Sequence, residues 1–305
     1  MVQKDSLKKV IVICGPTASG KTALSVALAK KLGTEIISAD SLNIYKGLDI
    51  GTAKPTLEER ENVKHHLIDV VSPKSEFSVV DYKELATPIL EQLLKNGKIP
   101  IICGGTGFYI NALLYDFSYG EGKANLEVRE YYNNLALEKG KEYVYGILSE
   151  KDPETAEKLH YNDLKRVVRA LEILHNGKKK SEIKDEKIPK YDFKAYSVAF
   201  PLKTLYERIE RRVDNMIDEG LVDEVKNLLD SGVNKDDQCM QGIGYKEIVG
   251  YLQGEYDLSS AIDLIKLNTR HYAKRQNTFF KKLDNLTYLA PDSAEIMADR
   301  IIKDL

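Results

Sequence analysis

A glycine-rich octapeptide near the amino terminus constrains the fold of this chain more than any other feature. Residues 15–22 read GPTASGKT and fit the pattern G-x-x-x-x-G-K-[ST]. An apolar run, KVIVIC, precedes them at Lys9–Cys14, and an amphipathic pattern follows at Lys21–Leu32. Strand, loop and helix in that order predict a P-loop, in which backbone amides and the positive end of a helix face phosphate oxygens. A glycine-rich turn that binds no ligand is the alternative interpretation.

The motif also predicts which chemical groups of the loop bind the ligand. The glycines let several N–H groups point inward, the Lys21 ammonium neutralises phosphate charge, and the Thr22 hydroxyl can bind Mg²⁺. A ligand with at least two phosphates is therefore expected against the loop residues Gly15, Pro16, Thr17, Ala18, Ser19, Gly20, Lys21 and Thr22. The motif alone does not distinguish a nucleotide from another pyrophosphate compound.

Further periodic segments predict the rest of the fold. Strand-like runs alternate with helical patterns and lie at residues 34–39, 98–103, 195–200 and 286–290. This alternation predicts an α/β fold with a P-loop NTPase-like parallel sheet flanked by helices. From residue 116 to 190 the pattern is helical without a convincing strand, apart from a Gly-rich connector at 116–125 and a charged loop at 177–189. We expect an α/β core of residues 1–115 and 191–305, interrupted by an all-helical insertion domain of residues 116–190.

Charge and composition exclude several classes of protein. The 305 residues include 45 basic and 47 acidic ones, so a uniformly basic nucleic-acid-binding surface is excluded. Local basic stretches remain: 165–180 has six Lys or Arg against one acid, and 270–282 has five and none. Such stretches bind nucleic acid or are simply solvated faces. Cys14, Cys103 and Cys239 form no C-x-x-C pair, which argues against a zinc site or a disulfide framework and favours the cytoplasm. No leader or membrane-spanning run is visible.

Polar residues follow two of the predicted strands. Asp40 comes after the second run, and the third ends in Gly104-Gly105-Thr106-Gly107. Ligands of open parallel sheets bind beyond the carboxyl ends of the strands, so Asp40 and Thr106 are expected near the P-loop. The Asp40 carboxylate could act as a general base or hold a metal, and Thr106 could donate or accept a hydrogen bond. Capping or turn roles for both residues are the alternatives.

At this point the residues resemble a known family. The chain is similar to the bacterial tRNA dimethylallyltransferases, also called tRNA isopentenyltransferases. The matching blocks occur in the family order and are GPTASGKT at 15–22, DSLNIYKGLDIGTAKP at 40–55, HHLID at 65–69, GGTGFY at 104–109, NDLKRVVRALE at 162–172, QGIGYKE at 241–247 and TRHYAKRQNTF at 269–279. The resemblance implies transfer of a dimethylallyl group from dimethylallyl pyrophosphate to the exocyclic N6 amine of the adenosine 3′ to the anticodon, in tRNAs that read codons beginning with U.

The resemblance also implies residue roles. Asp40 would be the general base, with Lys21 and Thr106 as further catalytic residues. Arg212 would join the P-loop in binding the donor pyrophosphate, although Arg208 lies one helical turn earlier and leaves that assignment open. Mg²⁺ would be bound partly by Thr22.

The resemblance implies the anticodon stem-loop of tRNA as the partner. We expect a monomer that does not associate with a membrane. The family's tRNA-contacting residues map onto Asp40, Ser41, Leu42, Asn43, Thr106, Arg129, Lys165, Arg166, Val167, Val168 and Arg169. Three other functions remain as alternatives. An ATP-dependent kinase would use the same P-loop, a prenyltransferase acting on free adenine nucleotides would need no basic surface, and an RNA-binding module would need no catalytic carboxylate.

Overall fold

The structure is a computed structural model, which describes residues 8–117, 125–183 and 187–305. The amino-terminal segment and parts of the two connectors around the insertion therefore lie outside the described residues. The chain forms two compact units, residues 1–115 with 189–305, and residues 116–188. Pro189 and Lys190 thus belong to the first unit rather than to the insertion. In the described parts of the chain, no helix is both long and apolar enough to span a bilayer.

The first unit is built on a parallel sheet of six strands in the order β3-β2-β4-β1-β5-β6. Its strands are β1 (Lys9–Cys14), β2 (Ile36–Ser38), β3 (His65–His66), β4 (Ile101–Gly104), β5 (Asp192–Val198) and β6 (Leu286–Leu289). All neighbouring pairs run parallel. The carboxyl ends of β1, β2 and β4 therefore meet at one edge, where ligands bind in open α/β sheets.

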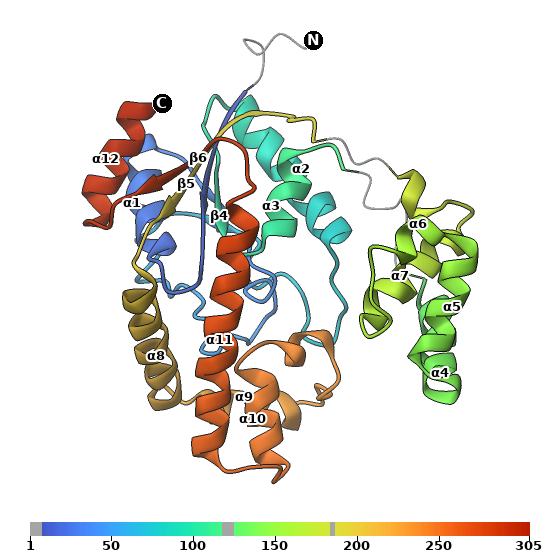
Figure 1. The fold of residues 1–305 in the computed structure, drawn as a ribbon. Helices are drawn as coiled ribbons and strands as arrows, with labels where there is room; N and C mark the ends of the chain where they lie inside the picture. Colours follow the sequence, from blue (N-terminus) through green and yellow to red (C-terminus); the bar gives the residue numbers. More distant parts are fainter. Residues whose placement is uncertain (1–7, 118–124, 184–186) are drawn as a thin grey trace. The chain divides into compact units, whose positions relative to one another are not determined.

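Helices cover both faces of this sheet. The helices of this unit are α1 (Lys21–Leu32), α2 (Val79–Lys95), α3 (Gly107–Leu114), α8 (Leu202–Asp218), α9 (Leu221–Asp230), α10 (Tyr245–Leu252), α11 (Leu258–Phe280) and α12 (Ala294–Asp304), with a short 3₁₀ turn at Gln238–Gln241. Of these, α8, α9 and α10 lie beyond the carboxyl ends of the strands rather than on a face of the sheet (Figure 1). Helices α1 and α12 lie together on one side, and α2 and α3 lie together on the other (Figure 1). This arrangement confirms the predicted α/β class with a parallel sheet flanked by helices.

The core explains why the apolar runs become buried strands. Ile11 and Ile13 of β1, Ile36 of β2 and Ile101 of β4 are at most 1% exposed, and they pack against apolar side chains of α1 and α12. Burying each such side chain contributes about 1.5–3 kcal/mol relative to leaving it in water. Strands buried on both faces are continuously apolar, which is the pattern of KVIVIC.

The second unit is helical. It contains α4 (Leu126–Lys139), α5 (Lys141–Lys151), α6 (Pro153–Ala156), α7 (Leu164–His175) and a 3₁₀ turn at Lys180–Glu182. The α7 stripe of Val167, Ala170 and Leu171 packs into a small core with residues of α4 and α5. This confirms the helical pattern of the insertion in its described residues.

Candidate active site

The predicted P-loop lies between β1 and α1. Gly15 adopts a φ of +131°, and a Cβ there would lie 2.4 Å from the Ser197 hydroxyl oxygen, so only glycine fits. The Ser19 hydroxyl donates to the Pro16 carbonyl at 2.8 Å and closes the loop on itself. Gly20 has a left-handed conformation and begins α1. The first amides of α1 therefore point out of the loop toward any anion bound there.

Three cations surround the loop. The Lys21 ammonium donates to the Pro16 carbonyl at 2.6 Å, and burial together with the Arg212 charge lowers its pKa to about 8. Arg208 donates to the Ala18 carbonyl at 2.7 Å, and Arg212 approaches the Thr17 hydroxyl at 3.4 Å. Burial and the Arg208 charge also lower the pKa of Arg212. Buried cations that repel each other favour the binding of an anion between them.

Arg208 and Arg212 have different surroundings. Arg212 lines a cavity of about 490 Å³ that also contains Thr17, Lys21 and Thr22, whereas Arg208 is bonded to the loop backbone. The structure therefore favours Arg212 as a ligand contact and Arg208 as a support for the loop.

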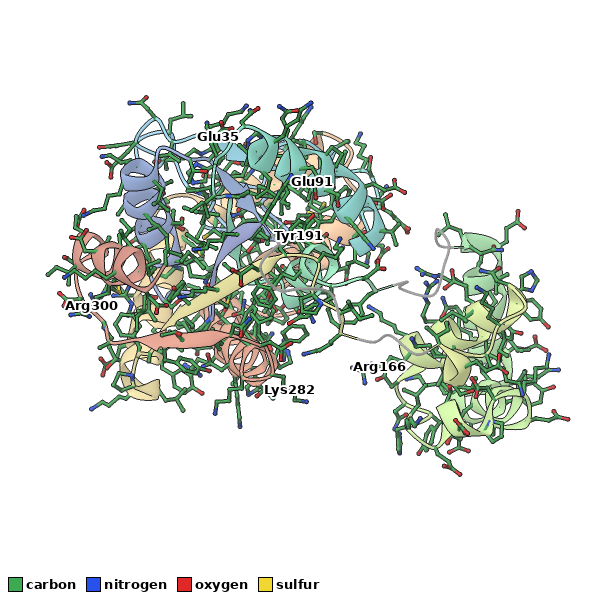
Figure 2. All side chains as sticks on the ribbon, turned by 90° about the horizontal axis from the view of Figure 1, so that it is seen from above. Glu35, Glu91, Arg166, Tyr191, Lys282 and Arg300 are labelled. Carbon is green, nitrogen blue, oxygen red and sulfur yellow. The ribbon has the colours of Figure 1, made fainter. Side chains whose placement is uncertain are left out.

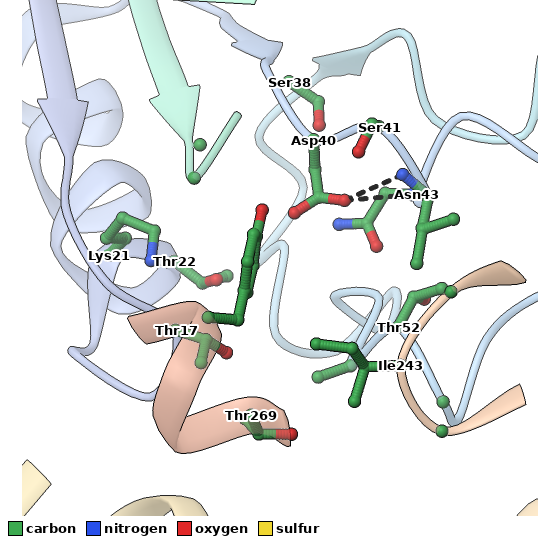
Figure 3. A pocket seen from close by; sticks show the side chains of 18 of the residues that line it. Thr17, Lys21, Thr22, Ser38, Asp40, Ser41, Asn43, Thr52, Ile243 and Thr269 are labelled. Carbon is green, nitrogen blue, oxygen red and sulfur yellow. Dashed lines mark hydrogen bonds between the residues drawn. The ribbon is translucent and has the colours of Figure 1, made fainter. Parts of the chain in front are cut away.

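Asp40 stands in the same cavity, in the loop after β2. Its Oδ1 accepts hydrogen bonds from the amides of Leu42 at 2.9 Å and Asn43 at 3.3 Å (Figure 3). This is the turn role that the sequence left open. Within the described residues Oδ2 has no hydrogen-bond partner, so the turn fixes the direction of the carboxylate while one oxygen remains able to accept a proton.

Thr106 connects the loop after β4 to the loop after β2. Its hydroxyl accepts from the Ser41 amide at 3.0 Å and donates to the Ser41 hydroxyl at 3.3 Å. Its own amide donates to the Ala39 carbonyl at 3.0 Å. These bonds hold Thr106 beside the Asp40 turn, at the carboxyl ends of the neighbouring strands β4 and β2.

Gln276 of α11 is a site residue that sequence reasoning missed. It is 5% exposed, accepts from the Thr17 amide at 2.9 Å and donates to the Gly105 carbonyl at 3.0 Å. The close approach requires glycine, because a Cβ on Gly105 would lie 2.2 Å from the Gln276 amide nitrogen. Gln276 thus ties the P-loop to the Thr106 loop. The only sequence signal was its place in the block TRHYAKRQNTF.

Glu224 of α9 is a second missed residue. Its carboxylate accepts from the amides of Asp49, Ile50 and Gly51 at 2.7–3.1 Å and from the Tyr245 hydroxyl at 2.6 Å. A carboxylate with four donors fixes the GLDIG segment, whose Gly51 lines the cavity. The partners are 21 or more residues apart, so no local sequence pattern could have paired them.

The cavity brings most of the predicted core residues together. Figure 3 shows Lys21 and Thr22 on one side of it and Asp40, Ser41 and Asn43 on the other. Leu42, Thr52, Ile243, Thr269 and Tyr272 complete much of the remaining wall. The P-loop residues Lys21 and Thr22 and a carboxylate held by its own turn thus face one cavity.

Within the described residues, no group of three or more His, Cys, Asp or Glu side chains could hold a metal ion. The Thr22 hydroxyl does line the cavity at the first turn of α1. Mg²⁺ usually keeps several waters and is bound by few protein oxygens plus substrate phosphates. The Thr22 hydroxyl therefore fits a Mg²⁺ ion that arrives with a phosphorylated ligand.

The residues of the second unit that the sequence assigns to tRNA contact differ in their exposure. Lys165 and Arg166 are exposed, and Arg166 lies 3.3 Å from Asp163 (Figure 2). Val167 and Val168 are 0% and 4% exposed, so their side chains serve packing rather than contact with a partner. Arg129 and Arg169 both contact the Glu172 carboxylate.

Glu172 is completely buried in the second unit. Its Oε2 accepts from Arg129 at 3.0 Å and Arg169 at 2.7 Å, and its Oε1 accepts from the Asn125 amide at 2.6 Å. Although burial opposes ionisation, these hydrogen bonds together hold the Glu172 pKa below its usual value. Arg129 and Arg169 therefore have an internal partner that sets their direction.

Comparison with known proteins places these features in context. A family model described as IPP transferase matches residues 43–283. A tRNA dimethylallyltransferase from Acetivibrio thermocellus is 46% identical over 303 residues, covering 98% of this chain and 96% of that protein. Another, from Alkaliphilus oremlandii, is 45% identical and covers 97% of each.

Solved structures give the same result. A tRNA isopentenylpyrophosphate transferase from Bacillus halodurans superposes with a TM-score of 0.73 at 40% identity, covering 97% of this chain and 96% of that one. A eukaryotic dimethylallyltransferase, described as acting on tRNA, superposes with a TM-score of 0.80 at 32% identity, covering 93% of this chain and 74% of that one.

Proposed function

Because the chain belongs to the IPP transferase family of tRNA dimethylallyltransferases, we propose that it carries out the full reaction implied by its sequence. It transfers a dimethylallyl group from dimethylallyl pyrophosphate to the exocyclic N6 amine of the adenosine 3′ to the anticodon. The tRNAs are those reading codons that begin with U, and pyrophosphate is released. The observation that carries the proposal is that a phosphate-binding loop and the Asp40 carboxylate line one cavity.

The pyrophosphate of the donor binds at the P-loop. Loop amides, the Lys21 ammonium and the Arg212 guanidinium surround the position expected for its oxygens. Negative charge grows on the pyrophosphate as the allylic C–O bond breaks, so donors already aimed at that charge lower the barrier. Arg208 and Gln276 act indirectly by holding the loop backbone.

A Mg²⁺ ion bound with the donor would be held by the Thr22 hydroxyl and phosphate oxygens. When bound, it supplies further neutralisation of the leaving group. Residues of the chain itself bind the donor, orient the acceptor and remove the proton from the acceptor amine.

The acceptor amine needs help because its lone pair is delocalised into the adenine ring. Asp40 removes a proton from N6 as the new C–N bond forms, a role typically worth ~10²–10⁴ in rate. The turn at Leu42 and Asn43 holds the carboxylate in place, and Thr106 holds the neighbouring Ser41. Pyrophosphate leaves with the electrons of the broken C–O bond, so charge and atoms balance.

The target base must leave its stack to enter the cavity. Loop nucleotides are the easiest to extrude, which suits an anticodon-loop adenosine. We assign the anticodon arm to the second unit, whose exposed Lys165 and Arg166 can contact phosphates. In this assignment Arg129 and Arg169 contact tRNA while Glu172 orients them.

Asp40→Asn tests the chemistry without disturbing the loop, because an amide oxygen can still accept from Leu42 and Asn43. Pyrophosphate release with dimethylallyl pyrophosphate, Mg²⁺ and unmodified tRNA should fall by ~10²–10⁴-fold, while tRNA affinity stays within a few-fold. Asp257→Asn is the matched control, since Asp257 also accepts from a backbone amide in a turn, at the start of α11. Near-normal turnover of Asp40→Asn, or ATP hydrolysis in place of prenyl transfer, would refute the proposal.

A further inference from the structure

A lysine is buried close to the cavity. Lys54 belongs to the block at 40–55, and only 4% of its side chain is exposed. Its ammonium donates to the Asp49 carboxylate at 2.6 Å, the Asp69 carboxylate at 2.5 Å and the Tyr45 carbonyl at 2.9 Å. The three N–H donors of the ammonium therefore all have acceptors. We call Lys54, Asp49 and Asp69 the Lys54 cluster.

The burial of this ammonium needs a physical reason. Taking a charge out of water is unfavourable, and an apolar side chain of similar length would fill the same space without that cost. What the charge adds is direction, because it brings three oxygen atoms to one point. Beside the cluster, Ala53, Leu67 and Asp69 have φ angles of +49°, +61° and +58°. Non-glycine residues keep this conformation only where their surroundings determine it, so the cluster holds two strained loops in one arrangement.

A continuous chain of hydrogen bonds leads from Lys54 to Asp40. Asp69, whose carboxylate accepts from Lys54, donates its backbone amide to the Asn43 carbonyl at 3.1 Å. Asn43 in turn donates its own amide to Oδ1 of Asp40 at 3.3 Å (Figure 3). Because each link is a hydrogen bond, displacing Asp69 displaces the turn that holds the Asp40 carboxylate.

The loop after β2 and the loop after β3 are paired beyond this chain as well. Val71 forms a parallel bridge with Tyr45, and its amide donates to the Ile44 carbonyl at 3.0 Å. These contacts continue the parallel pairing of β2 with β3. The two loops therefore form one hydrogen-bonded unit. The Lys54 ammonium contacts both of them, through Tyr45 in the first loop and Asp69 in the second.

We propose that Lys54 is a positioning residue for the Asp40 base. Its ammonium fixes Asp69, and Asp69 fixes Asn43, whose amide aims the Asp40 carboxylate at the acceptor amine. Lys54 thus acts through the two loops rather than by contact with the reacting atoms. This inference rests on the proposed function, because it takes Asp40 to be the group that removes the proton.

The test measures the chemical step as single-turnover prenyl transfer, with donor and unmodified tRNA both saturating. Lys54→Met should lower this rate by about 10- to 100-fold, since a displacement of about 1 Å can cost 100-fold. The donor KM should stay unchanged, because Arg208 and Gln276 hold the P-loop independently. Lys98→Met is the matched control: Lys98 also donates to a carboxylate, that of Glu35 at 2.7 Å, and its loss should leave the rate as in the wild type.

Asp69, whose side chain is 43% exposed, offers a second variant that leaves the buried packing intact. Asp69→Gly removes the carboxylate, and glycine adopts a φ of +58° without strain, so the rate should fall as in Lys54→Met. Asp69→Asn keeps an oxygen that can accept from Lys54 and tolerates the same backbone conformation. It should therefore react at nearly the wild-type rate. A normal rate in Asp69→Gly would contradict the inference.

A double-mutant cycle separates positioning of the base from a merely structural role. If Lys54 acts through the Asp40 carboxylate, Lys54→Met should change the rate of Asp40→Asn little, because no base is left to aim. An equal loss of rate in both backgrounds would overturn the inference. A wild-type rate in folded Lys54→Met, or a raised KM for tRNA as the only change, would also overturn it. Wild-type protein that transfers nothing would instead overturn the proposed function, and this inference with it.

Discussion

The charge of Lys21 should set the pH range over which the donor binds. The ammonium is buried against the Pro16 carbonyl, and burial together with the nearby Arg212 lowers its pKa to about 8, below the usual value for lysine. Raising the pH from 7 to 9 therefore reduces its protonated fraction from about nine-tenths to about one-tenth. The donor phosphates change little in this range, since a last pKa near 6 leaves them about nine-tenths ionised at pH 7 and almost fully ionised at pH 9.

If only the charged form binds pyrophosphate well, the KM for dimethylallyl pyrophosphate rises about tenfold between pH 7 and 9. The sign follows from the lowered pKa: the cation is present below pH 8 and is lost above it, and donor binding above pH 8 takes up a proton. The assay is initial-rate kinetics at saturating tRNA across this range. Lys21→Arg remains charged throughout, so its donor KM should be higher overall but independent of pH. A wild-type KM that stays flat to pH 9 would refute the reasoning.

Three further substitutions test supports of the site, of the second unit and of the fold. Gln276→Ala leaves a buried amide and a buried carbonyl unpaired, so it should raise the donor KM and lower the free energy of unfolding by about 2–4 kcal/mol, measured by denaturant titration. Glu172→Gln removes the buried partner of two arginines and should destabilise the second unit by about 3–5 kcal/mol, seen as an earlier unfolding transition, with weaker tRNA binding. Lys98 and His66 help hold the Glu35 pKa near 2, so Glu35 should stabilise the fold above pH 4.5 and lose that effect as pH falls toward 2. Glu35→Gln should flatten this acid limb of a thermal-unfolding profile; an unchanged limb would contradict the assignment.

Secondary-structure elements that carry a strong local sequence pattern were predicted with their correct bounds. Strand β1 and helix α1 begin and end where the sequence indicated, because an apolar run, a glycine-rich loop and an amphipathic repeat act over short distances. Helices α4 and α5 were not delimited, because neither begins with a motif comparable to the P-loop. Strand β3 has two residues and no pattern of its own, and its place depends on pairing with β2.

The sequence named Asp40, Lys21, Thr22 and Arg212, which the structure places along one cavity, and it missed the residues that support their loops. The P-loop, Asp40 and Thr106 carry local motifs at strand ends, so their meeting follows from a parallel sheet. Gln276 and Glu224 act through partners that are up to 259 and 175 residues away in sequence. Such pairings arise from tertiary packing, which a single sequence does not display.

The most direct measurement of the central claim is the mass of tRNA fragments after reaction. Unmodified tRNA that reads a codon beginning with U is incubated with the protein, dimethylallyl pyrophosphate and Mg²⁺, then digested and analysed by tandem mass spectrometry. The account predicts one added dimethylallyl group, on N6 of the adenosine 3′ to the anticodon, and none with Asp40→Asn. An unmodified loop, or a prenyl group on any other nucleotide, would contradict it.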